Sequence, residues 1–171
     1  MRNLLLLVIT LLFIPKSTFA QTKLIGAENF SVSLPQQFKR TIGNNDLAVV
    51  QWEHLNKEIY GYVLFENIDE LKIANINHEL AYYADIALND FNDYSNYKLI
   101  KARKYKTSNG KETEERELTY DDEENNIHVH TIINVYKTSN FIYKMINFGS
   151  EDTFNETRNE IDYIINKLQL P

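Results

Sequence analysis

The sequence predicts an α+β sandwich, with a single, mostly antiparallel, twisted sheet of about six strands flanked by helices. Several runs alternate apolar and polar residues, which is typical of strands with one buried face. The Asn109-Gly110 pair between two such runs favours a tight hairpin turn. Two segments far apart in the chain carry apolar residues at helical spacing. Because hairpins produce antiparallel neighbours and two amphipathic helices can cover the faces of a sheet, these observations favour a layered α+β fold.

The C-terminal third, residues 127–168, predicts strand, turn, strand and helix. Ile127–Tyr136 alternates between apolar and polar side chains, residues 138–140 supply turn chemistry, and Phe141–Phe148 is rich in strand formers. Thr153 and Glu156 match a capping box at the start of the helix. The helix itself is indicated by apolar residues that share one face: Phe154, Ile161, Ile164, Ile165 and Leu168.

The N-terminal half predicts four short strands after a leader over residues 21–29. The strands are Phe30–Leu34, Phe38–Ile42, Leu47–Glu53 and Ile59–Phe65. Apolar residues fall on both sides of the third strand, which is typical of a sheet that is covered on both faces.

The middle of the chain predicts a helix followed by a hairpin. Apolar residues recur at helical spacing over Leu80–Phe91, and Asn75 or Asn77 can cap this helix. The strands of the hairpin are Tyr97–Tyr105 and Glu112–Tyr120. The second strand carries so many charges that we expect one wet face and a position near the sheet edge.

The first 20 residues predict a cleaved signal peptide. Arg2 supplies a positive charge, residues 4–14 form an apolar run, and residues 18–20 place small side chains where a signal peptidase reads them. The run of about 11 residues is too short to span a bilayer, which needs about 20. An uncleaved N-terminal anchor is the alternative. Cleavage would leave residues 21–171 as a single α+β domain without a stable membrane span.

Charge and cysteine content argue against several classes of function. The chain has 171 residues and a formal charge of −6, and removal of residues 1–20, which hold two cations and no acid, changes the charge to −8. This balance argues against nucleic-acid binding, which usually needs a basic stripe, and against charge-driven binding to an anionic membrane. The absence of cysteine excludes disulfides, thiol catalysis, zinc–thiolate sites and Fe–S clusters.

Two stretches resemble the Mog1/PsbP-like superfamily. The first is Phe30–Pro35, an aromatic-led strand that ends in proline, and the second runs from Phe141–Phe148 through Ser150–Phe154 to Ile161–Leu168. The resemblance covers about residues 28–169. It implies a twisted antiparallel sheet flanked by helices and an accessory or binding role, since members include photosystem assembly factors, a partner of a small GTPase and bacterial envelope proteins. No catalytic motif is shared across the superfamily, so the resemblance assigns no functional residue.

His128 and His130 are the candidate metal ligands. Residues at i and i+2 of a strand share one face, as metal-binding His-x-His pairs do. A metal site needs a third ligand, and the sequence places neither His54 nor His78 beside the pair. The alternative is two ordinary polar residues on the less buried face of a strand.

The chain has 11 tyrosines, and three of them are the candidate partner-binding residues. Tyr60 and Tyr62 share one predicted strand, and Tyr82 lies off the apolar stripe of the first helix. A tyrosine offers apolar area and a polar tip to a ligand or partner. The alternative is that tyrosine fills half-buried sheet positions, where it has good propensity.

Residues 121–126, Asp-Asp-Glu-Glu-Asn-Asn, form an acidic segment. Calcium prefers such oxygen ligands, but the spacing lacks the alternating ligands and central glycine of an EF-hand loop. We therefore expect a solvated loop.

No catalytic motif of a hydrolase, nucleotide-binding enzyme or zinc protease occurs in the sequence, and we expect no cofactor. The prediction is an exported, periplasmic or secreted, non-catalytic accessory protein of the bacterial cell envelope that binds a protein partner or a small ligand. One alternative is a metal-dependent or hydrolytic enzyme that uses the His128/His130 face. Another is a structural or stress-related periplasmic factor without a tight ligand.

Overall fold

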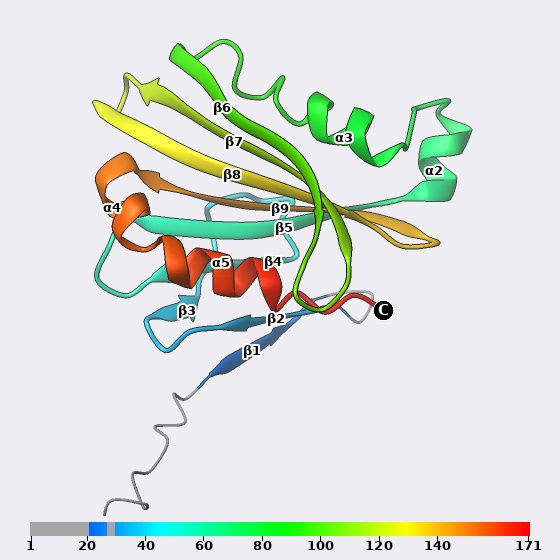
Figure 1. Cartoon of the computed structure of the whole chain (residues 1–171), viewed down its shortest axis with the longest axis horizontal. Helices are drawn as coiled ribbons and strands as arrows, with labels where there is room; N and C mark the ends of the chain where they lie inside the picture. Colours follow the sequence, from blue (N-terminus) through cyan, green and yellow to red (C-terminus); the bar gives the residue numbers. More distant parts are fainter. Residues whose placement is uncertain (1–20, 27–29) are drawn as a thin grey trace, which may run out of the picture.

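A seven-stranded antiparallel sheet forms the middle layer of the protein in this computed structural model, which describes residues 21–26 and 30–171 (Figure 1). The strands follow one another across the sheet in the order β3 (Phe38–Arg40), β4 (Val50–His54), β5 (Ile59–Asn67), β9 (Phe141–Ser150), β8 (Ile127–Lys137), β7 (Glu112–Asp122) and β6 (Ser95–Lys106). A second sheet pairs β1 (Thr22–Ile25) with β2 (Ser31–Leu34). The predicted α+β sandwich is thus confirmed, with seven strands in the main sheet instead of about six.

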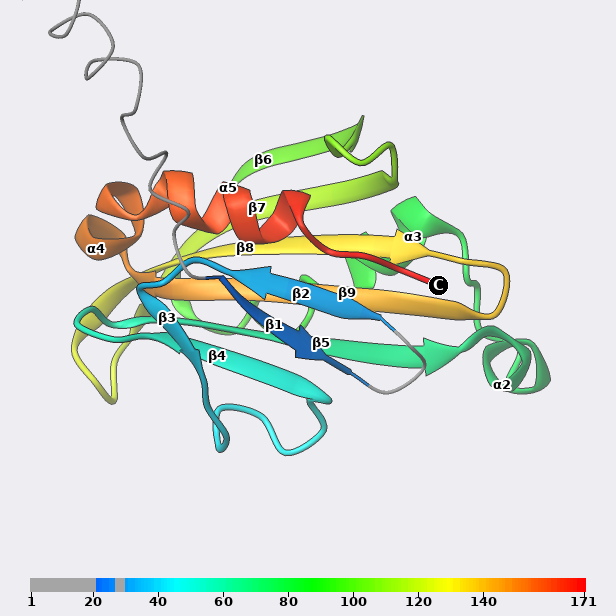
Figure 2. The same cartoon turned by 90° about the horizontal axis from the view of Figure 1, so that it is seen from below.

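One face of the main sheet is covered by the β1–β2 pair and by α5 (Arg158–Asn166), which follows α4 (Glu151–Glu156) (Figure 2). The core on this side contains fully buried aromatic residues, namely Phe30, Trp52, Tyr143 and Phe154. Fully burying a large apolar side chain contributes about 1.5–3 kcal/mol, so this cluster is a major source of stability. Two backbone hydrogen bonds between Ser31 and Gln169, of 2.9 and 2.8 Å, tie the end of the chain to β2.

The opposite face carries α2 (Ile68–Ile73) and α3 (Leu80–Ile86) (Figure 1). Here the buried residues Tyr83 and Ala84 of α3 pack against Leu118 and Ile133 of the sheet. Alternation along β8 explains the two layers, because Ile132 belongs to the first core and Ile133 to the second. The sheet is therefore covered on both faces, as the apolar pattern of the third predicted strand suggested.

Two elements, β1 and α2, were not predicted from the sequence. β1 lies in the segment expected to be a leader, and only Leu24 of its four residues is buried, so it has little alternation to detect. α2 has six residues and is too short for a helical repeat to stand out. Its start is stabilised locally, because the side chain of Asn67 accepts a hydrogen bond of 2.8 Å from the backbone N–H of Asp69.

The predicted helix caps were wrong in detail. The C-terminal helix is divided at Thr157, and Ser150 precedes its first part without a side-chain capping hydrogen bond, so Thr153 and Glu156 do not form the expected capping box. The N-cap of α3 is Glu79. The Asn77 side chain accepts from the Glu79 backbone N–H at 2.9 Å, which organises the turn before the helix instead of its first turn.

The predicted hairpin between β6 and β7 is confirmed. Gly110 has a φ of 82°, a value that glycine adopts without steric cost, and its N–H donates to the Thr107 carbonyl at 2.8 Å. The predicted signal peptide, residues 1–20, lies outside the described residues. Within residues 21–26 and 30–171, no helix has the length and apolar character that crossing a membrane requires.

Candidate functional site

His130 is a buried residue held between β7 and α4. Its exposed fraction is 5%, and its ring stacks on Phe154 with centroids 4.3 Å apart and an interplanar angle of 10°. Its Nε2 lies 2.9 Å from Oε1 of Glu117. Its Nδ1 is buried and has no hydrogen-bond partner within the described residues. The imidazole is therefore part of the packing between the sheet and α4.

His128 lies at the same side of β8 but in a more open position. Its Nδ1 hydrogen-bonds a carboxylate oxygen of Asp121, and its Nε2 lies 3.6 Å from Oε2 of Glu151. The two ring nitrogens thus face two different carboxylates. Among residues 21–26 and 30–171 there is no group of three or more His, Asp or Glu side chains that could hold a metal ion.

The other histidines supply no third ligand. The Nδ1 of His54, on β4, accepts from the backbone N–H of Asn56 at 3.1 Å, and the ring packs edge-on against Phe38. The carbonyl of His78 accepts from Nζ of Lys137 at 2.9 Å, at the opposite end of β8 from His128. The metal hypothesis for His128 and His130 thus gains no further ligand from the described residues.

The charged strand β7 lies next to the edge strand β6, as expected, but it lacks the wet face that its charges suggested. β6 is the edge strand and pairs with β7, and the exposed fractions of Glu114, Glu115, Arg116 and Glu117 are 7, 1, 5 and 5%. Burial of a charge is costly unless an opposite charge and hydrogen bonds compensate it. Sequence reasoning missed this because the charges look like surface residues when their partners on β6, α3 and α5 are unknown.

Each buried acid of β7 is paired with arginine. Glu115 accepts from Nε and Nη2 of Arg103 at 2.7 and 3.1 Å, in a bidentate arrangement. Glu114 accepts from Nη1 of Arg116 at 3.0 Å, on the other face of the sheet. Glu117 accepts from Nη1 of Arg158 at 2.7 Å as well as bonding His130.

The Glu117 carboxylate is strongly stabilised in its charged form. Burial by itself would raise the pKa of Glu117, but hydrogen bonds to His130 and Arg158, together with the positive charge of Arg158, outweigh burial and lower the pKa to about 2. A carboxylate of this kind is a poor proton acceptor near neutral pH. The His130–Glu117–Arg158 cluster therefore joins β8, β7 and α5 and does not form an acid–base pair poised for catalysis.

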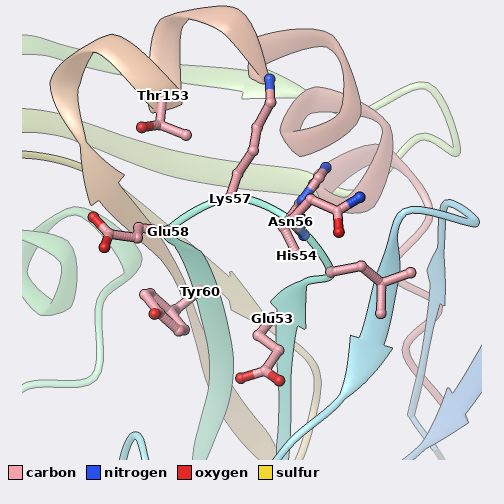
Figure 3. A pocket seen from close by; sticks show the side chains of 8 residues that line it. Glu53, His54, Asn56, Lys57, Glu58, Tyr60 and Thr153 are labelled. Atoms are coloured by element: carbon pink, nitrogen blue, oxygen red, sulfur yellow. Dashed lines mark hydrogen bonds between the residues drawn. The ribbon is translucent and has the colours of Figure 1, made fainter.

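A hollow of about 580 Å³ opens beside the turn between β4 and β5 (Figure 3). Its lining residues are Glu53, His54, Leu55, Asn56, Lys57, Glu58, Tyr60 and Thr153. Figure 3 shows Glu58 and Tyr60 on the same side of the turn, whereas Lys57 extends away from them towards α4. The Nζ of Lys57 lies 3.1 Å from Oε2 of Glu156 on α4.

A second hollow, of about 400 Å³, adjoins the first, because Glu58 and Tyr60 line both. Its lining residues are Glu58, Tyr60, Tyr120, Asp122, Asn125, Ile127, Val129, Phe148, Gly149 and Ser150. We call this second hollow the aromatic groove. The rings of Tyr60 and Phe148 have centroids 5.5 Å apart, and Tyr120 is packed by Tyr94 at 4.5 Å.

The three predicted tyrosines have different surroundings. Tyr60 is half-buried and forms the wall between the two hollows. Tyr62 packs edge-on against Phe148, with ring centroids 6.1 Å apart, and burial raises the pKa of its phenol. Tyr82 on α3 is 46% exposed and lines neither hollow. Tyr120 and Phe148 were missed because they come from other hairpins, whose neighbours are not apparent from alternation.

The acidic segment 121–126 begins inside β7 and ends in a turn. The Asp122 carboxylate accepts from the backbone N–H and the side-chain amide of Asn125 at 3.1 and 2.8 Å, and these hydrogen bonds lower its pKa. A third hollow of about 330 Å³ shares Asp122 with the aromatic groove. It is lined by Asp93, Tyr94, Ser95, Asp121, Asp122, Glu123 and Glu124.

Comparison with known proteins reveals similarity in fold alone. No protein-family model matches the sequence, and a comparison with curated proteins finds no match. Cyanobacterial PsbP (CyanoP) from Synechocystis sp. PCC 6803 is similar in structure, with a TM-score of 0.62, 12% identity, and coverage of 92% of this chain and 96% of that one. LpqN, involved in cell envelope biogenesis of Mycobacterium tuberculosis, has a TM-score of 0.62, 8% identity, and coverage of 93% and 95%.

A structure from Bacteroides thetaiotaomicron is also similar, with a TM-score of 0.57, 11% identity, and coverage of 88% of this chain and 48% of that one. At such identities the likeness establishes the fold and no function. The resemblance to the Mog1/PsbP-like superfamily, inferred above from the two ends of the chain, is therefore confirmed at the level of the fold.

Proposed function

We propose that this protein is an exported, non-catalytic accessory protein of the bacterial cell envelope that binds its partner or ligand at the two hollows around Tyr60. Export is supported by the signal-like residues 1–20. An accessory role is supported by the similarity in fold to PsbP and to LpqN, the latter described as involved in cell envelope biogenesis. The paired state of the buried acids of β7 also favours binding over acid–base chemistry.

The observation that carries this proposal is the position of Tyr60. It is half-buried, packs against Phe148, and separates two adjoining concave surfaces of about 580 and 400 Å³. Concave sites with aromatic walls and a few polar groups are the usual form of binding sites. Phe148 packs beside the Tyr60 ring, so a ligand would meet a pre-ordered surface and little side-chain entropy would be lost on binding.

Affinity capture tests the proposal. The protein with a C-terminal tag is purified from the native envelope and compared with the Tyr60→Ala and Tyr82→Ala variants. We expect wild type and Tyr82→Ala to retain the same stoichiometric partner and Tyr60→Ala to lose it. Tyr82 is the matched control because it is exposed, has the same chemistry, and lines neither hollow.

The folded state of each variant is checked by circular dichroism and thermal melting. Retention of the partner by a folded Tyr60→Ala variant would contradict the proposed site. N-terminal sequencing of the envelope form tests export, and we expect it to begin at Gln21. A chain that begins at Met1 would contradict the proposed cleavage.

A further inference from the structure

We infer that the aromatic groove binds an organic cation, an ammonium or guanidinium group held between aromatic faces and carboxylates. This inference deepens the proposed function and rests on it, because it names the ligand chemistry of the same site.

Three aromatic side chains from three strands line the groove, together with the apolar residues Ile127 and Val129. Tyr60 and Phe148 stand side by side on β5 and β9, which are paired at these two residues. Tyr120 on β7 faces them across Val129 of β8, with which it is paired. The volume of about 400 Å³ lies in the usual range for small-ligand sites, about 300–1,000 Å³. It accommodates one cationic head group with its attached carbon chain.

The charge around the groove has one sign. Glu58 and Asp122 line it, and the adjoining third hollow adds Asp93, Asp121, Glu123 and Glu124. No lysine or arginine is among the described residues that line either hollow. Lys57, the neighbour of Glu58, is directed away and pairs with Glu156. His128 lies beside Asp121 at this acidic edge, and its two nitrogens face Asp121 and Glu151.

The position of Glu58 at the groove is fixed by the backbone. A Cβ atom at Gly149 would collide with the Glu58 carbonyl oxygen, so the absence of a side chain allows the start of β5 to approach β9 closely. This approach places the Glu58 side chain at the edge shared by the two hollows, beside the Tyr60 ring (Figure 3).

Aromatic faces and carboxylates favour the same kind of ligand. The face of a tyrosine or phenylalanine ring is electron-rich and attracts ammonium and guanidinium groups. Burial, reinforced by the negative charge of Asp122, raises the pKa of Tyr120 to about 12, so its ring stays a neutral phenol. An anion would be repelled by the carboxylates, and a bare metal ion would find no convergent set of ligands in the described residues. An organic cation is attracted both by the faces of the rings and by the carboxylates.

Isothermal titration calorimetry with two probes tests the inference on the tagged, envelope-purified protein. The probes are choline and a tetralysine peptide, which represent a free ammonium compound and a basic side chain. Their controls are 3,3-dimethyl-1-butanol, the neutral isostere of choline, and tetraglutamate. We expect at least one cation to bind at millimolar concentration or below, both controls to fail, and added sodium chloride to weaken binding by screening.

Three variants locate the bound cation. Glu58→Gln and Tyr60→Ala are each expected to weaken binding at least about tenfold, which corresponds to about 1.4 kcal/mol. Glu70→Gln removes the same charge from an exposed position on α2 and is expected to leave binding unchanged. Absence of binding by both cations, equal binding of the neutral isostere, or equal effects of Glu58→Gln and Glu70→Gln would each overturn the inference.

The outcomes also distinguish a basic polypeptide from a small ammonium compound, and a failure of this inference from a failure of the proposed function. Binding of tetralysine alone assigns the groove to a basic segment of a polypeptide, and binding of choline alone assigns it to a small ammonium compound. Loss of the envelope partner in Tyr60→Ala without any cation binding would overturn this inference and leave the proposed function intact. Cation binding that depends on Tyr60, with an envelope partner that does not, would overturn the proposed partner site instead.

Discussion

The sheet face beneath α4 and α5 and the groove around Tyr60 both contain several acids, but the acids differ in whether cationic side chains accompany them. Under the helices, Glu115 and Glu117 are almost fully buried and each is bonded to an arginine. At the groove, Glu58 and Asp122 are accessible and no arginine or lysine among the lining residues faces them. Acids therefore stabilise the fold where arginine accompanies them under the helices, whereas the acids at the groove have no lysine or arginine beside them in its lining.

Glu117→Gln should produce the largest change, because it removes the anion shared by His130 and Arg158. We expect the free energy of unfolding to fall by about 3 kcal/mol at neutral pH, the usual cost of leaving a buried charge without its partner. Urea denaturation measures this change. Glu112→Gln on the same strand is the control, because its side chain is 54% exposed and its pair with Lys104 should contribute less than about 1 kcal/mol. Equal losses in the two variants would contradict the structural role of the cluster.

The same cluster predicts a pH dependence. The pKa of Glu117 is lowered from 4.5 to about 2 in the folded protein, so its stabilisation is fully present above pH 4.5 and is lost as the pH falls towards 2. The difference in unfolding free energy between wild type and Glu117→Gln should therefore shrink by about 3 kcal/mol over this interval. Denaturation of both proteins at a series of pH values measures it. A difference that does not change with pH would contradict this assignment.

Tyr60→Ala should have a smaller effect on stability than on binding. Its ring is half-buried and packs on Phe148, so we expect a loss of about 1 kcal/mol in unfolding free energy. Thermal melting of Tyr60→Ala and Tyr82→Ala measures this loss. A decrease as large as that of Glu117→Gln would indicate that Tyr60 is a core residue rather than a wall of a binding site.

Zinc is expected to have the smallest effect. The nitrogens of His128 face Asp121 and Glu151, and Nε2 of His130 bonds Glu117, so three of the four ring nitrogens already face a carboxylate of the protein. Calorimetry with micromolar zinc should therefore detect no uptake. Uptake that disappears in both His128→Ala and His130→Ala would support the metal site predicted from the sequence.

The candidate residues were predictable to different extents. Alternation placed Tyr60 and Tyr62 on one strand and His128 and His130 on another, and both placements agree with the structure. Alternation could not reveal that Phe148 lies beside Tyr60, because that contact depends on the pairing of β5 with β9, about 80 residues later. The charged run of β7 was misinterpreted for the same reason, since its partners Arg103 and Arg158 lie on other elements.

The sequence alone indicated most of the strands, the Asn-Gly turn and the two main amphipathic helices, and hence the class of fold. These features depend on side-chain periodicity and backbone preference, which act over a few residues. The order of the strands, the pairing of the buried acids and the rings around each hollow became apparent only in the folded chain. Strand order and register depend on the combined energy of many long-range contacts, so the site they assemble has no local signature in the chain.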